Sequence, residues 1–261
     1  MNTNSQLQKN KDNSFTLELI LDKNLLKKEY QHVLGHFQAE FEQKGFRKGK
    51  APLDVVEKNV SPQAILEEVL NHLLPTAYQQ ALKDHQLRPI IEPTIKIKNE
   101  KLSLDTDWHL ELTSSELPSV KISPSLYIES KKIDKDKTDQ LVDLIIKKTQ
   151  VELPQVLITH DLNHRLSGLV SELQQVKLTL DEYLKNKKTT ITKLREDMTA
   201  QIKKDWTLNL AINQIAIDKK LTVSDKELDT VFAKNPELKK DPNLVYFLLT
   251  QQKVLEFLKQ A

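Results

Sequence analysis

The chain has 261 residues, of which 38% are hydrophobic and 29% are charged, and its formal net charge is only +2. A chain of this length forms one or two domains, and a net charge near zero excludes a protein that binds nucleic acid through a global basic field. The absence of cysteine excludes disulfides, thiolate nucleophiles and cysteine metal sites. Only four glycines accompany ten prolines, which argues against a glycine-rich β-barrel and favours long helices.

The first residues of the chain predict no ordered element. Residues 1 to 13 are polar and hold no apolar stretch, so we expect a disordered tail and no secretory signal. The longest apolar runs elsewhere are a few residues long, too short to span a membrane. A strand is predicted over residues 14 to 22, because Phe15, Leu17 and Leu19 alternate with polar side chains.

Helical periodicity follows. Between residues 24 and 44 the apolar side chains form one face of a long helix: Leu26, Tyr30, Val33, Leu34, Phe37 and Phe41. Gly45 is placed to end this helix, because glycine accepts the left-handed conformation that follows a helix. Pro52 suits the start of a short helix. Ser61, followed by a proline, predicts the start of a second long helix, and Pro75 within that helix predicts a kink or a break.

Strand character returns over residues 88 to 117. Ile95 and Ile97 alternate with lysines, and a second alternating stretch begins at Trp108. A turn around Asn99 would join the two stretches as a hairpin.

Pro118 and Pro124 mark a boundary in the chain. After it, residues 121 to 133 look extended, a helix is expected from about 134 to 150, and the remainder has helical patterns. Two of these helices begin with capping boxes, one at Thr179 with Glu182 and one at Ser224 with Glu227.

The predicted fold class is therefore an α+β N-terminal domain followed by an all-α C-terminal domain. Four segments make up the expected domain organisation: a tail over 1–13, the α+β domain over 14–120, a linker and connecting helix over 121–150, and the helical domain over 151–261.

The segment KGFRKGK, residues 44 to 50, is the most distinctive short stretch. Four of its seven residues are cationic, and Gly45 and Gly49 allow the backbone to turn sharply. Phe46 does not continue the core period of the preceding helix, so an exposed ring among cations is one interpretation. Such a tip is typical of a protein interface, and it also suits RNA through phosphate contacts and base stacking. The alternative is a solvated connection whose phenylalanine folds back on its own helices.

Histidine pairs at i and i+4 occur at His160 with His164 and at His32 with His36. This spacing can place two metal ligands on one helix face. The first pair is followed by Asp161 instead of the glutamate of the metalloprotease motif, and neither pair has a third ligand with a sequence signature. We therefore expect solvated or capping histidines, no metal site, no cofactor and no catalytic residues.

The segment GFRKGKAP is similar to the ribosome-binding signature of the trigger factor family, bacterial nascent-chain chaperones. The preceding strand and helix, the following LDVVEKNV, the stretch AYQQALKDHQLRPIIEP and the later SELPSVKIS resemble the N-terminal domain of that family. The second half resembles its helical domain, from LPQVLITHDLNHRLSGLVSEL through LTLDEYLK and KLREDM to LAINQIAIDKKLTVSDKELDTV.

One departure from the family pattern is clear. Family members usually carry a prolyl isomerase domain of the FK506-binding type between these halves. In this chain VELPQVL opens the helical half directly after about residue 150, and the only glycine after Gly49 is Gly168. The resemblance therefore implies a short form without the isomerase domain, which is not an enzyme.

The resemblance implies a function and a set of site residues. The ribosome-binding residues would be Gly45, Phe46, Arg47, Lys48, Gly49 and Lys50. Phe46, Arg47 and Lys48 would form the tip that docks on protein and ribosomal RNA beside the exit tunnel, Gly45 and Gly49 would shape the turn, and Lys50 would add charge. Four cations imply a slope of roughly −2 to −3 in log K against log salt, a modest affinity.

The helical half would then hold nascent or unfolded polypeptides. It would do so without ATP, since no nucleotide-binding motif is present. The protein would assist protein folding and export in the cytoplasm and would not bind membranes. Two alternatives stay open: a ribosome-associated factor that binds no clients, and a holdase that works without the ribosome. The sequence leaves open whether the chain forms a homodimer.

Overall fold

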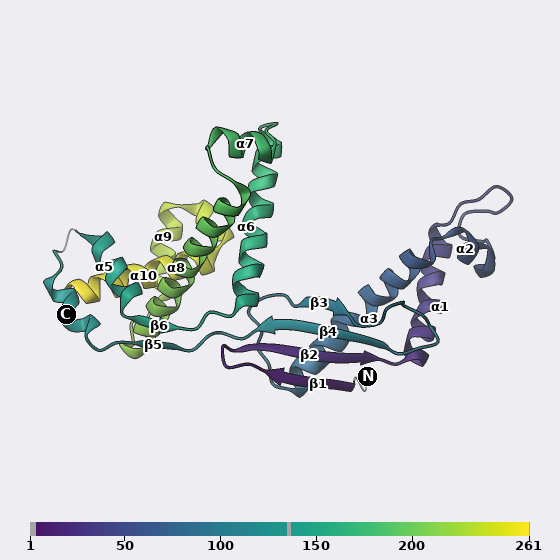
Figure 1. Cartoon of the computed structure of the whole chain (residues 1–261), viewed down its shortest axis with the longest axis horizontal. Helices are drawn as coiled ribbons and strands as arrows, with labels where there is room; N and C mark the ends of the chain where they lie inside the picture. Colours follow the sequence, from purple (N-terminus) through teal and green to yellow (C-terminus); the bar gives the residue numbers. More distant parts are fainter. Residues whose placement is uncertain (1–3, 135–136, 261) are drawn as a thin grey trace. The chain divides into compact units, whose positions relative to one another are not determined.

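The chain divides into two units between Leu117 and Pro118. The computed structural model describes residues 4–134 and 137–260, coloured along the sequence in Figure 1. The first unit ends three residues before the predicted end of the α+β domain. Residues 121 to 150, which were expected to be a linker and a connecting helix, are instead part of the second unit.

An antiparallel sheet of four strands forms one layer of the first unit, in the order β1-β2-β4-β3. The strands are β1 (Asn4–Lys9), β2 (Ser14–Leu21), β4 (Trp108–Ser115) and β3 (Thr94–Ile97). The predicted pairing of the last two strands is confirmed, but residues 98–107 connect them instead of a tight turn. Asn99 fixes this longer loop, because its side chain donates to the carbonyl of Asp107 at 3.0 Å and accepts from the amide of His109 at 2.7 Å.

The prediction of a disordered tail over residues 1 to 13 is wrong for residues 4 to 9. These residues form β1, which pairs with β2 from Asn4 opposite Ile20 to Lys9 opposite Phe15. Residues 1 to 3 lie outside the described part of the chain. The polar composition misled the prediction, because an edge strand needs only one apolar contact with the core, which Leu7 supplies, and takes the rest of its stability from backbone hydrogen bonds.

Three helices complete the first unit: α1 (Lys23–Glu40), α2 (Leu53–Asn59) and α3 (Pro62–Asp84). Asp22 caps α1 by accepting from the backbone N–H of Asn24 at 2.8 Å. Of the kink or break expected at Pro75, the break is absent, because α3 continues through this residue. Burial of Leu73, Leu74 and Ala77 on either side of this proline outweighs the local cost of about 3 kcal/mol.

The core of the first unit lies between α1, α3 and one face of the sheet. The largest side chains that are almost fully buried there are Phe15, Leu17, Leu19, Leu21, Leu26, Leu34, Ile65, Leu73, Trp108, Leu110 and Leu112. Alternate residues of β2 and β4 face this core, as the period of two predicts.

The second unit is mainly helical and starts with a small two-stranded sheet of β5 (Val120–Ile122) and β6 (Thr149–Val151). Its helices are α4 (Leu126–Glu129), α5 (Thr138–Lys147), α6 (Gln155–Gln175), α7 (Leu180–Asn186), α8 (Ile191–Asp218), α9 (Asp225–Lys234) and α10 (Pro242–Gln260), with short 3-10 helices at Ser130–Lys132 and Pro236–Lys240. Both predicted capping boxes are present.

Residues 121 to 133 are part of the core of the second unit and not an extended linker. Leu126 on α4 is fully buried and packs with α5, α8 and α10 through Leu141, Ile215 and Val254. No sequence pattern indicates this role, because one buried leucine in a short helix has no periodicity.

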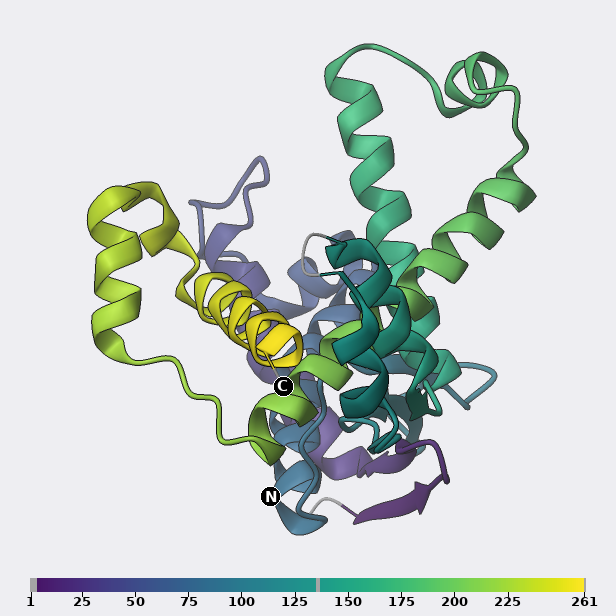
Figure 2. The same ribbon diagram turned by 90° about the vertical axis from the view of Figure 1, so that its left-hand side faces the viewer.

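Helices α6 and α8 pack together and form an arm with α7 at its outer end, as Figures 1 and 2 show. A separate small core holds the two helices together through Ile158, Leu162 and Ile202. None of the helices in the described ranges is long and apolar enough to cross a membrane.

Candidate functional site

The basic segment forms a loop between α1 and α2. The predicted end of α1 at Gly45 is wrong, because the helix stops at Glu40 and Phe41 is already extended. The backbone N–H of Phe41 donates to the carbonyl of Gln38 at 3.1 Å and closes the last turn. Four residues between the helix end and Gly45 therefore belong to the loop, which makes it longer than the sequence predicted.

Two hydrogen bonds close the base of this loop. The backbone N–H of Gly49 donates to the carbonyl of Phe41 at 3.2 Å. The side-chain amide of Gln38 donates to the carbonyl of Ala51 at 2.7 Å, and Ala51 is fully buried. The two ends of the loop are thus held side by side, and residues 42 to 48 project from a fixed base.

Both glycines adopt the left-handed region, with φ of 99° at Gly45 and 72° at Gly49. At Gly49 there is a second constraint, because a Cβ atom there would lie 3.0 Å from the carbonyl oxygen of Ala39. Gly49 is therefore needed both for its backbone conformation and for a close approach to α1. Gly45 is needed for its conformation alone, since nothing lies within 4 Å of its would-be Cβ.

The tip of the loop exposes a ring and several cations. Phe46 is 41% exposed, and Arg47, Lys48 and Lys50 are also exposed. The only ion pair described for these cations joins Lys48 Nζ to Glu42 at 3.6 Å, and both side chains are well exposed. The exposure of Phe46 disagrees with the alternative in which the ring folds back on its own helices.

This arrangement can bind a surface but offers no acid or base poised for catalysis. An exposed ring can insert into an apolar niche or stack on a base. Guanidinium and ammonium groups beside it can pair with phosphates or carboxylates. The chemistry is that of a small docking tip whose attraction is screened by salt.

Sequence reasoning missed the residues that hold the loop in place. These residues are Gln38, described above, and the hydrogen-bonded pair of Tyr30 and Glu57. The hydroxyl of Tyr30 donates to Glu57 Oε1 at 2.8 Å and links α1 to α2 on the two sides of the loop. Burial raises the pKa of Tyr30 to about 12, with a further contribution from the bond to Glu57. A half-buried glutamine and an exposed glutamate carry no sequence signal for this role.

The second unit exposes apolar side chains at several places, among them the arm and α10. Val176, at the outer end of α6, is 70% exposed, and Ile191, at the start of α8, is 40% exposed. On α10, Leu244 and Leu248 stand one turn apart and are also exposed. Exposed apolar side chains of this kind are typical of surfaces that contact other molecules.

An open hollow of about 600 Å³ lies on the arm between α6 and the first half of α8. Its lining mixes apolar and charged side chains: Leu162, Thr192, Arg195, Glu196, Thr199, Ala200 and Lys203. Such a mixed, open surface suits weak contacts with varied sequences better than it suits one small ligand.

Two family models match the chain. A model described as bacterial trigger factor protein matches residues 3–149, and one described as its C-terminus matches residues 128–261. The two matches overlap, so together they cover residues 3–261 without a gap, and no isomerase domain is found between them.

Several trigger factors are similar in sequence. The trigger factor of Lactococcus lactis subsp. cremoris strain SK11 is 28% identical over 155 residues, which are 58% of this chain and 35% of the relative. That of Caldanaerobacter subterraneus subsp. tengcongensis is 29% identical over 153 residues, 59% of this chain and 35% of the relative. The chain thus matches about a third of the length of these relatives.

A solved structure of the trigger factor chaperone, described for its promiscuous substrate recognition in folding and assembly, shares the fold. The TM-score is 0.70 at 13% identity, covering 98% of this chain and 99% of that one. At this identity the likeness supports the fold alone. The N-terminal family match, which covers more than half of the chain, decides the assignment: this protein belongs to the bacterial trigger factor family.

Proposed function

We propose that this chain is an ATP-independent chaperone that docks on the ribosome through the loop at Gly45–Lys50 and shields nascent or unfolded polypeptides with its helical unit. The observation that carries the proposal is the exposed Phe46 at the tip of a basic loop with a closed base, in a member of this family.

The loop supports docking in two ways. Its cations and ring suit the protein and ribosomal RNA beside the exit tunnel. The small number of cations limits the affinity, which lets the chaperone leave the ribosome again. Gln38 and Gly49 would hold the tip in its binding conformation, so that little conformational entropy is lost on docking.

The helical unit supports client binding through its exposed apolar side chains. Val176 and Ile191 on the arm, with Leu244 and Leu248 on α10, offer separate small patches for extended segments that have not yet buried their own apolar residues. We propose the cytoplasm as the place of action and expect no prolyl isomerase activity and no cofactor requirement for holding clients.

Ribosome co-sedimentation at low and moderate salt tests the docking step. The native chain should pellet with vacant ribosomes, and a variant with Phe46, Arg47 and Lys48 changed to alanine should stay in the supernatant. A control with Lys185 and Lys187 changed to alanine also removes two exposed cations, but from the end of α7 and the residue after it, and should pellet like the native chain. If the loop variant pellets as well as the native chain, the loop is not the docking tip.

Suppression of aggregation of an unfolded test protein tests the holding step and separates the alternatives. We expect suppression at near-stoichiometric amounts, and we expect the loop variant to suppress aggregation equally well, because its tip is distant in sequence from the helical unit. No suppression at several-fold excess would favour a ribosome-associated factor without client binding. Suppression without ribosome binding would favour a holdase that works alone.

Refolding of a substrate limited by proline isomerisation tests the absence of enzyme activity. That step takes about 10–100 s at 25 °C without a catalyst. Clear acceleration by catalytic amounts of the chain would contradict the proposal.

A further inference from the structure

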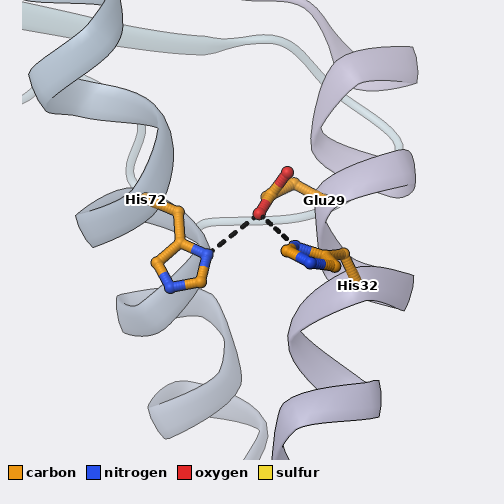
Figure 3. A group of neighbouring side chains, drawn as sticks. All are labelled: Glu29, His32 and His72. Atoms are coloured by element: carbon orange, nitrogen blue, oxygen red, sulfur yellow. Dashed lines mark hydrogen bonds and ion pairs between the residues drawn. The ribbon is translucent and has the colours of Figure 1, made fainter.

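Three histidines from two helices converge with glutamates on the first unit. Glu29 Oε1 lies 2.9 Å from His32 Nδ1 and 2.9 Å from His72 Nδ1, as Figure 3 shows. These three ligand atoms all lie within 4.8 Å of one another. The ring of His36 is also close, with centroid distances of 4.4 Å to His32 and 5.5 Å to His72.

The cluster depends on the packing of α1 against α3. Glu29, His32 and His36 stand at i, i+3 and i+7 and so share one face of α1. His72 comes from α3, which packs beside that face. The sequence shows no third ligand signature beside His32 and His36, because His72 reaches them only through the packing of the two helices.

A second glutamate lies beside His72. The ring Nε2 of His72 lies 3.3 Å from Glu68 Oε1, one turn earlier on α3. A carboxylate beside one ring nitrogen can hold the ring so that the other nitrogen, here the Nδ1 that faces Glu29, points at a metal ion. This is the arrangement in which metal-binding histidines are commonly held.

Nδ1 of His72 and Oε1 of Glu29 lie 2.9 Å apart. Such a contact is favourable only when a proton or a metal cation lies between the two atoms. His32 directs its own Nδ1 at the same oxygen, so two imidazole nitrogens and one carboxylate share a single centre.

The spacing of the ligands is close to what a metal ion needs. Zinc bonds of about 2.0–2.1 Å in a tetrahedron place neighbouring ligand atoms about 3.3 Å apart. The two contacts at Glu29 are a little shorter than this, and small side-chain rotations would open them. The side chains of Glu29 and His72 are 19% and 29% exposed, so an ion could enter from solvent without unfolding the helices.

We propose that Glu29, His32 and His72 bind a zinc-type transition-metal ion, with His36 as the fourth ligand and Glu68 as the residue that orients His72. Imidazole and carboxylate ligands suit Zn²⁺ and disfavour Mg²⁺ and Ca²⁺, which prefer oxygen ligands alone. The ion would fasten α1 to α3 about one to three turns before the end of α1, and so would stabilise the first unit.

Zinc titration against a chromophoric chelator tests the site. The full chain should bind one Zn²⁺, and Co²⁺ should give the absorption of a tetrahedral site. Changing both His32 and His72 to alanine should weaken the Zn²⁺ affinity by about 100-fold or more, and Glu68→Gln by about 10-fold. Excess Mg²⁺ should not compete.

The matched control removes His160 and His164, a pair with the same spacing on α6 of the other unit. This control should bind Zn²⁺ like the native chain. Circular dichroism checks that each variant folds, and the single variant His72→Gln keeps the side chain polar if the double variant unfolds. The proposal is overturned if Zn²⁺ does not bind at 100 μM, if the variants in the His32–His72 cluster bind normally, or if the control loses the site.

A thermal melt gives a second, independent readout. Zn²⁺ should raise the unfolding temperature of the native chain and of the control, but not that of the cluster variants, because binding to the folded state alone stabilises it. An equal rise in all of these proteins would also contradict the proposal.

Discussion

Gln38, on the last turn of α1, donates a hydrogen bond of 2.7 Å to the carbonyl of the fully buried Ala51, thirteen residues later. Together with the bond from the N–H of Gly49 to the carbonyl of Phe41, this contact joins the two ends of the basic loop. Because the carbonyl of Ala51 is out of contact with water, loss of its donor leaves a buried acceptor unpaired.

We therefore expect Gln38→Ala to lower the free energy of unfolding of the first unit by about 1 kcal/mol. It should also increase the rate of tryptic cleavage after Arg47, Lys48 and Lys50, because the base of the loop opens more often. The control Gln43→Ala changes an exposed glutamine within the loop and should leave both measurements unchanged. Equal cleavage of the two variants would show that Gln38 does not hold the loop.

Substitutions of two glycines on or beside α1 should have opposite effects. Gly49→Ala places a Cβ atom 3.0 Å from the carbonyl of Ala39 at a φ of 72°, and should destabilise the first unit by about 1–2 kcal/mol. Gly35 lies within α1, and nothing lies within 4 Å of the Cβ atom that an alanine would add there. Gly35→Ala should therefore stabilise the first unit by about 0.5–1 kcal/mol.

Urea unfolding followed by the fluorescence of the buried Trp108 measures both effects. A Trp206→Phe background removes the signal of the second unit. A Gly49→Ala variant as stable as its parent would contradict the close approach of the loop to α1.

Asp161 connects the two helices of the arm. It accepts from the indole N–H of Trp206 at 3.2 Å and pairs with Arg165, which also reaches Asp205 at 2.8 Å. Asp161→Ala should therefore lower the free energy of unfolding of the second unit by about 1–3 kcal/mol.

The control Asp197→Ala removes an exposed ion pair with Lys193 from the same arm. It should change the free energy of unfolding by less than about 0.5 kcal/mol. The fluorescence of Trp206 reports the transition, and equal effects of the two variants would contradict the role of Asp161.

The contact between α9 and α10 should weaken in acid. The pKa of Glu227 is lowered from its ordinary value of 4.5 to about 2. The largest cause is the hydrogen bond from Lys253, followed by the hydrogen bonds from the N–H and the hydroxyl of Ser224. Because the folded state favours the ionised form, the stabilisation is present above about pH 4.5 and is lost as the pH falls towards 2.

A Glu227→Gln variant should consequently have a lower urea midpoint than the native chain at pH 6, and the difference should shrink between pH 4.5 and pH 3. Glu237→Gln removes an exposed carboxylate from the 3-10 helix between α9 and α10. Its urea midpoint should match that of the native chain at pH 6 and at pH 3. A difference that stays constant with pH would rule out the ionised carboxylate as the cause.

The sequence by itself determined the features that depend on local pattern. The strand at residues 14 to 21, the long helices, the capping boxes at Thr179 and Ser224, and the exposed basic segment at Gly45–Lys50 all follow from the spacing of neighbouring residues. Local pattern failed where it was weak, as in the polar edge strand β1 and in α4, whose one fully buried leucine gives no period.

Only the tertiary structure decided which distant residues meet. The end of α1 at Glu40, the bond from Gln38 to Ala51, and the approach of Gly49 to Ala39 depend on how the loop folds back on the helix. The meeting of His72 with Glu29 and His32 depends on the packing of α3 against α1. These contacts arise from burial of apolar faces along whole helices, which fixes the positions of polar side chains that carry no signal of their own.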